Sequence, residues 1–175
     1  MTYTLNMVCE ALKSYRGSPH IPKSEIIPYR GVMLLPENSD DMKKDILYVC
    51  RLTEALKRRE TKPGHHYVCI RDRFWDADET EDFLNGIIVI NENNDVPWLF
   101  NLIQQRFLQL AEWETQMQQA VIEDSGYQRL LDISEPILSN FTAVLDSTYK
   151  LLAYTRGLSN DDPINIELVK KGYHS

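Results

Sequence analysis

The chain has 175 residues, of which 43% are hydrophobic and 26% charged, and this ordinary globular composition excludes a low-complexity protein. Its net charge of −7 argues against a nucleic-acid-binding surface on this segment, because neutralising phosphates requires clustered Lys and Arg. We find no apolar stretch approaching the roughly 20 residues that span a bilayer. A signal peptide is also not visible, so we expect a cytoplasmic protein that does not contact a membrane.

The first 95 residues predict a small α/β domain with a mostly parallel sheet. Apolar residues at helical spacing indicate a helix over 4–15, which Gly and Pro residues then end. Short apolar runs indicate buried strands at 31–35, 46–50, 67–70 and 86–90. Helices are expected between strands, at 52–59 and, with an acidic first turn, at 76–84. Strands that alternate with helices are typical of a parallel sheet.

A long connecting helix is expected over 96–124. Asp95 is positioned to cap its N-terminus, and Pro97 suits its first turn. Six apolar residues fit a heptad spacing, with Glu114 as a miss: Phe100, Ile103, Phe107, Leu110, Met117 and Val121. Trp113 widens this stripe and is counted with it. Such a stripe must pack against something, either the chain's own domains or a second copy. We predict that it forms a dimerisation seam, and therefore a homodimer.

Residues 125–175 predict a second, smaller unit. A helix carries the apolar residues from Leu130 to Leu138, and two short apolar runs at 141–145 and 151–154 follow. A short polar link joins these runs, which is a hairpin signal. A short amphipathic helix is expected after Pro163. The chain stops soon after the hairpin, so we expect the second unit to be truncated.

The sequence carries no catalytic motif: it has no P-loop, GxGxxG, GxSxG or HExxH. The thiols of Cys9, Cys50 and Cys69 lie in apolar surroundings, which favours buried, reduced cysteines over disulfides. His65 and His66 are adjacent and would point to opposite faces of a strand, so we expect no metal site there. No cofactor is expected either.

One region could bind a small ligand, because ligands bind where the strands of α/β sheets end. Two strands end near this region, and arginines beside an aromatic residue can form a pocket for a carboxylate. The candidate ligand-binding residues are Cys50, Arg51, Arg71, Arg73 and Trp75. A solvated loop anchored by a tryptophan is the alternative interpretation of the same residues.

Several packing motifs resemble a known family. The chain reads FLQLAEWE over 107–114, LLDIS over 130–134, VLD over 144–146 and LAYT over 152–155. This series is similar to the middle of PucR/CdaR-type transcription regulators, and residues 47–56 resemble the N-terminal α/β domain of many members. The resemblance implies a sensory α/β domain over 1–95, a dimerisation helix over 96–124, and the start of a GAF- or PAS-like α+β unit over 125–175. It also implies that DNA is bound only by a C-terminal helix-turn-helix outside this chain.

We therefore expect a non-enzymatic sensory and dimerisation region of a transcription regulator, with a small-molecule effector as a candidate partner. A free-standing protein-interaction adaptor is the second hypothesis, with the long helix as its binding face. A small α/β enzyme that uses Cys50 and Arg71 is the third.

Overall fold

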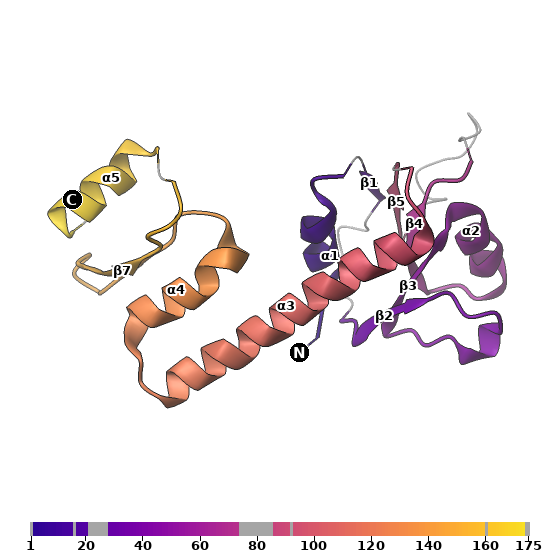
Figure 1. Cartoon of the computed structure of the whole chain (residues 1–175), viewed down its shortest axis with the longest axis horizontal. Helices are drawn as coiled ribbons and strands as arrows, with labels where there is room; N and C mark the ends of the chain where they lie inside the picture. The colour runs from indigo at the N-terminus through magenta and orange to yellow at the C-terminus, as the bar shows by residue number, and fades with distance from the viewer. Residues whose placement is uncertain are drawn as a thin grey trace. The chain divides into compact units, whose positions relative to one another are not determined.

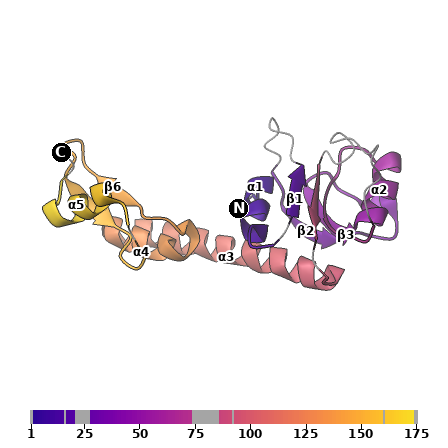
Figure 2. The same ribbon diagram turned by 90° about the horizontal axis from the view of Figure 1, so that it is seen from above.

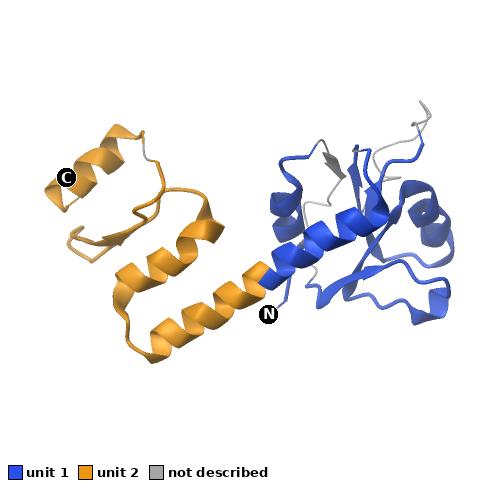
Figure 3. Ribbon diagram, in the orientation of Figure 1, with its two compact units in different colours: residues 1–108 blue, residues 109–175 orange. Residues whose placement is uncertain are grey.

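The computed structural model describes residues 2–15, 17–20, 28–73, 86–91, 93–159 and 161–173. The chain forms two compact units, residues 1–108 and 109–175, which are shown in different colours in Figure 3. Within the described residues, no helix combines the length and apolarity that a bilayer crossing requires.

A five-stranded sheet forms the centre of the first unit, with the strand order β1-β5-β4-β3-β2. Its parallel part consists of β2 (Gly31–Leu34), β3 (Ile46–Arg51), β4 (His66–Ile70) and β5 (Ile87–Ile90). These are the four strands that the apolar runs predicted, so the predicted parallel α/β sheet is confirmed. All residues of β4 and β5 are buried, as expected for strands covered on both faces.

The fifth strand, β1 (Gly17–His20), was not predicted, because Gly-Ser-Pro-His carries no apolar alternation. It pairs antiparallel with β5 at one edge of the sheet. Pro19 has no N–H to donate, and an edge strand is where a sheet tolerates this loss.

Helices cover both faces of this sheet. In Figures 1 and 2, α1 (Leu5–Leu12) and α2 (Leu52–Thr61) lie on opposite sides of the strands. The helix predicted over 52–59 is therefore confirmed. The face under α2 holds one buried cluster: Tyr48, Cys50, Leu52, Ala55, Leu56, Tyr67, Cys69, Ile87 and Val89. The helix predicted over 76–84 lies outside the described residues.

The long helix α3 (Val96–Ile122) contains 27 residues, close to the predicted range. The predicted cap is confirmed, because Asp95 Oδ1 accepts a hydrogen bond from the backbone N–H of Trp98 at 2.8 Å. The helix ends in a turn where Asp124 and Gly126 have φ angles of 51° and 79°.

The second unit combines a helix pair with a small hairpin. Helix α4 (Gly126–Leu138) holds Pro136 near its end, and the antiparallel strands β6 (Ala143–Leu145) and β7 (Leu151–Tyr154) follow. The side chain of Asp146 accepts backbone hydrogen bonds from Thr148 and Lys150 and so shapes the hairpin turn. Helix α5 (Pro163–Lys171) is capped at its N-terminus by Asp162, whose carboxylate accepts the N–H of Ile164 at 2.8 Å. The predicted hairpin and the short final helix are both confirmed.

Candidate functional site

The predicted ligand-binding residues lie at the carboxyl edge of β3 and β4. Arg51 ends β3 and is exposed, whereas Arg71 and Arg73 follow β4 and are half-buried. The two strands are direct neighbours, and Arg51 is the register partner of Ile70, so the topology brings these arginines to one edge. Trp75, the aromatic member of the predicted set, lies outside the described residues. The edge is therefore a cationic end of a parallel sheet, the place where α/β folds bind ligands.

The remaining residue of this set, Cys50, is not accessible at that edge. Its side chain is 1% exposed, and its Sγ atom lies 3.8 Å from Sγ of Cys69, its register partner on β4. Burial raises the pKa of the Cys69 thiol well above its usual value, and the contact with Cys50 raises it further. A nucleophilic cysteine needs the opposite shift, because the thiolate is the reactive form. Cys50 and Cys69 are therefore core residues.

Two carboxylates already occupy the start of α2 at the same edge. Glu54 accepts the backbone N–H of Arg51 at 3.1 Å. Asp72 accepts both the backbone N–H of Thr53, at 3.1 Å, and its hydroxyl, at 3.0 Å. Free N–H groups at a helix N-terminus bind anions such as phosphate, and here those of Arg51 and Thr53 are satisfied within the chain. An anionic ligand at this edge would have to rely on the arginine side chains.

Sequence reasoning missed these carboxylates. Glu54 lies three residues after Arg51, the spacing at which a glutamate reaches back to the first residue of a helix, so its role had a local signal. Asp72 carried no such signal, because it reaches α2 from the end of another strand.

A second candidate is a shallow groove of about 540 Å³ beside α2. Arg58 crosses it and donates to the backbone carbonyl oxygens of Pro36, at 3.0 Å, and Glu37. The groove carries two acidic and two basic side chains, so it presents no net charge to a ligand. Its lining residues are Leu35, Pro36, Glu37, Glu54, Lys57, Arg58 and Thr61.

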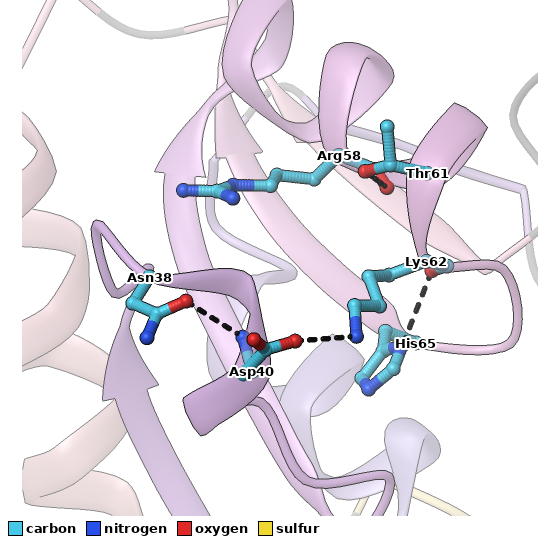
Figure 4. A network of polar contacts seen from close by, with 6 residues as sticks. All are labelled: Asn38, Asp40, Arg58, Thr61, Lys62 and His65. Carbon is cyan, nitrogen blue, oxygen red and sulfur yellow. Dashed lines mark hydrogen bonds and ion pairs between the residues drawn. The ribbon is translucent and has the colours of Figure 1, made fainter.

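Figure 4 shows the polar contacts next to this groove. Lys62 forms an ion pair with Asp40 at 3.0 Å, and its backbone carbonyl lies 3.1 Å from Nδ1 of His65. His66, in contrast, is buried and meets the ring of Tyr29 edge-on. Across the described ranges, no three His, Cys, Asp or Glu side chains gather as a metal site. His65 therefore makes a local contact with the backbone, and His66 packs against an aromatic ring.

The stripe predicted as a dimerisation seam is largely used inside the chain. Ile103, Phe107 and Leu110 are 0%, 5% and 3% exposed. The ring of Tyr3 stacks on Phe107 with centroids 3.8 Å apart, and the Tyr3 hydroxyl donates to the Phe107 carbonyl at 3.1 Å. These side chains form the inner face of α3, so they offer no surface to a second copy.

The remaining residues of the predicted seam differ in how far they are buried. Trp113 donates from Nε1 to the hydroxyl of Ser134 at 3.1 Å, and that hydroxyl lies 3.3 Å from Sδ of Met117, so both residues pack within the second unit. Phe100 is half-buried. Val121, at 65%, is the exposed member of the predicted seam.

A smaller hollow of about 210 Å³ lies between α3 and α4, beside the Trp113–Ser134 hydrogen bond. Its volume is below the usual range of small-molecule sites, so it is a weak candidate. It is lined by Gln109, Glu112, Trp113, Gln116, Ile133, Pro136 and Ile137.

Comparisons with protein-family models, with curated proteins and with solved structures find no match to this chain.

Proposed function

We propose that this chain is the sensory and dimerisation region of a bacterial-type transcription regulator and performs no catalysis of its own. The observation that carries the proposal is the sharing of α3 by both compact units. Leu99, Ile103 and Phe107, which belong to residues 1–108, are buried, and so are Leu110 and Ala120, which belong to residues 109–175. One helix therefore carries buried side chains in both units.

A helix placed in this way can couple two sites. Suppose that α3 has two packing arrangements and that a ligand bound to the first unit favours one of them; the second unit then responds through the same helix. The coupling free energy is the difference between the ligand's binding free energies for the two arrangements. In this proposal residues 1–95 are the sensory domain and residues 96–124 the connecting helix. Residues 125–175 begin a GAF- or PAS-like unit, and the order of helix α4 and hairpin β6–β7 agrees with this assignment.

The effector site in this proposal is the carboxyl edge of β3 and β4. Arg71 and Arg73 are half-buried there, and a guanidinium group binds a carboxylate through two parallel hydrogen bonds. The carboxylates of Glu54 and Asp72 at the same edge accept hydrogen bonds from the start of α2, so a bound anion would rely on the arginine side chains. A small molecule with at least one carboxylate is the effector class that this edge fits best.

Dimerisation is tested by fusing residues 1–175 to a DNA-binding domain that occupies its operator only as a dimer. We expect the fusion to repress a reporter gene, whereas the DNA-binding domain alone does not. A fusion that accumulates in the cell without repressing, together with a monomer mass by light scattering, would contradict the proposal and favour the adaptor hypothesis.

Effector binding is tested by thermal denaturation of the chain against a library of small carboxylates. We expect an active compound to raise the unfolding temperature of the wild type but not of Arg71→Gln. Arg129→Gln is the matched control, because Arg129 is an exposed arginine in the other unit. If the active compounds stabilise all three proteins equally, the effector site lies elsewhere.

A further inference from the structure

Two buried thiols meet directly inside the parallel sheet. Cys50 on β3 and Cys69 on β4 are register partners, and their Sγ atoms lie 3.8 Å apart. Both residues belong to the buried cluster under α2. Cys9, in contrast, is half-buried on α1, which lies on the opposite side of the strands. The three cysteines of the chain therefore form one isolated thiol and one touching pair.

The strand pairing already meets the main geometric requirement for a bond between these two sulfurs. Neighbouring strands lie about 4.7–4.9 Å apart, and the Cα atoms of a disulfide lie about 4.4–6.8 Å apart. The Sγ atoms of Cys50 and Cys69 would have to approach from 3.8 Å to about 2.0 Å, which rotation of the two side chains can supply.

The packing of the cluster favours such a bond over a bound metal ion. Forming a disulfide adds no atom and removes two hydrogens, so a close-packed core can accommodate it. A metal ion held between the two sulfurs, at about 2.3 Å from each, would push them to about 4.6 Å apart in a linear arrangement. The same contact therefore suits oxidation better than metal binding.

A phenol lies within electrostatic reach of both sulfurs. Tyr67 belongs to the same cluster, and its hydroxyl has no hydrogen-bond partner among the described residues. Burial raises the pKa of Tyr67, and the charges of Cys50 and Cys69 raise it further. An O–H donor in this position can stabilise a thiolate as it forms. Burial also raises the pKa of the Cys69 thiol, so the pair stays reduced until an oxidant acts on it.

We propose that Cys50 and Cys69 are a reversible oxidation site for hydroperoxides and form an intrachain disulfide between β3 and β4. The sulfur of one thiol attacks the peroxide O–O bond and takes one oxygen as a sulfenic acid, while an alcohol leaves. The second sulfur then forms the S–S bond, and the hydroxyl leaves as water with the remaining thiol proton. The two sulfurs lose two electrons, which reduce the peroxide to alcohol and water. This inference requires neither the dimer nor the effector of the proposed function.

The position of the bond gives oxidation a structural consequence. The disulfide would close the stretch from Cys50 to Cys69, which contains α2. Cys50 directly precedes Arg51, and Cys69 lies two residues before Arg71, so the bond would join the two strands that end at the candidate effector site. Disulfides in a reducing compartment are usually transient and report an oxidant.

Peptide mapping of the native chain tests the proposal. The chain is treated with cumene hydroperoxide, quenched in acid and digested with trypsin. We expect a disulfide that links peptides 45–51 and 60–71 and that dithiothreitol separates again. Circular dichroism during the treatment verifies that the chain stays folded.

Two variants provide matched controls. Cys9→Ser removes the isolated thiol and is expected to lose both remaining thiols together, without forming disulfide-linked dimers. Cys69→Ala keeps Cys50 but removes its partner, so no intrachain link is expected from the same treatment. Cys9→Ser leaves the buried pair intact, so the test does not depend on the folding of Cys69→Ala.

The outcomes decide the assignment. A link between peptides 45–51 and 60–71 that forms in the folded chain and is reversed by dithiothreitol supports the oxidation site. The proposal is wrong if Cys50 and Cys69 stay reduced in the folded chain while the urea-unfolded chain oxidises. It is also wrong if sulfinic acids accumulate without the link, or if the link forms only as the circular dichroism of the fold is lost.

Discussion

The inner face of α3 can be tested by truncating Phe107. Its ring is 5% exposed, stacks on Tyr3 and fills the core between α3 and the start of the chain. Removing a buried phenylalanine side chain costs about 3–5 kcal/mol in unfolding free energy, because both the transfer energy and the packing contacts are lost. Phe107→Ala is therefore expected to be among the most destabilising substitutions in α3.

The neighbouring residue provides the matched control. Leu108 is 62% exposed, so Leu108→Ala is expected to change the unfolding free energy by less than about 1 kcal/mol. Urea denaturation followed by circular dichroism, at two protein concentrations, measures both variants. The cost of Phe107→Ala is expected to be the same at both concentrations, because the contact lies within one chain. A loss below about 1 kcal/mol, or a loss seen only as weaker dimerisation, would refute the intrachain assignment.

Three further predictions concern the sheet. Burial raises the pKa of Tyr67 to about 12. The folded chain therefore resists deprotonation of this phenol, and the free energy of unfolding falls as the pH rises from about 10 to about 12. Tyr67→Phe should abolish this fall, which denaturation at alkaline pH measures. Gly86 has a φ of 81°, and an added Cβ would lie 2.6 Å from Cδ2 of the buried His66. Gly86→Ala should therefore lower the unfolding free energy, measured by urea titration, by at least about 2 kcal/mol. The half-buried thiol of Cys9 should react with a maleimide before the buried thiol of Cys50 in the native chain. Faster labelling of Cys50 would favour the enzyme hypothesis.

Tyr67→Phe also has an expected result at neutral pH. The Tyr67 hydroxyl is buried and has no hydrogen-bond partner among the described residues. Removing a buried polar group that is already unsatisfied is close to neutral or stabilising, so the variant should unfold at the same urea concentration as the wild type or higher. A clear loss of stability would mean that the hydroxyl has a partner, such as a buried water.

The sequence predicted the parallel strands well because each is a short apolar run between polar or turn residues. It could not predict β1, since Gly17–His20 takes its place only by pairing with β5, far along the chain. The periodicity of α3 correctly indicated an apolar face, but periodicity cannot say which partner covers that face. Tyr3, which stacks on Phe107, carries no signal for a contact across 104 residues.

The candidate site shows the same division between local and long-range information. The strand ends that position Arg51 and Arg71 were predictable, because apolar runs locate strand ends. The burial of Cys50 and Cys69 was predicted from their apolar neighbours, but the direct contact between the two thiols was not, because it depends on the register between two strands. Register follows from pairing across the whole sheet and cannot be obtained from either strand alone.

The contact between Tyr3 and Phe107 has a consequence for synthesis on the ribosome. Tyr3 leaves the exit tunnel early, but its partner is 104 residues further along the chain. At a translation rate of about 5–20 residues per second, Tyr3 waits roughly 5–20 seconds for Phe107 to be made. During this interval the strands can pair while the surface that α3 later covers stays open to water and to chaperones. The last step in maturing the N-terminal unit is therefore the arrival of a helix that also starts the next unit.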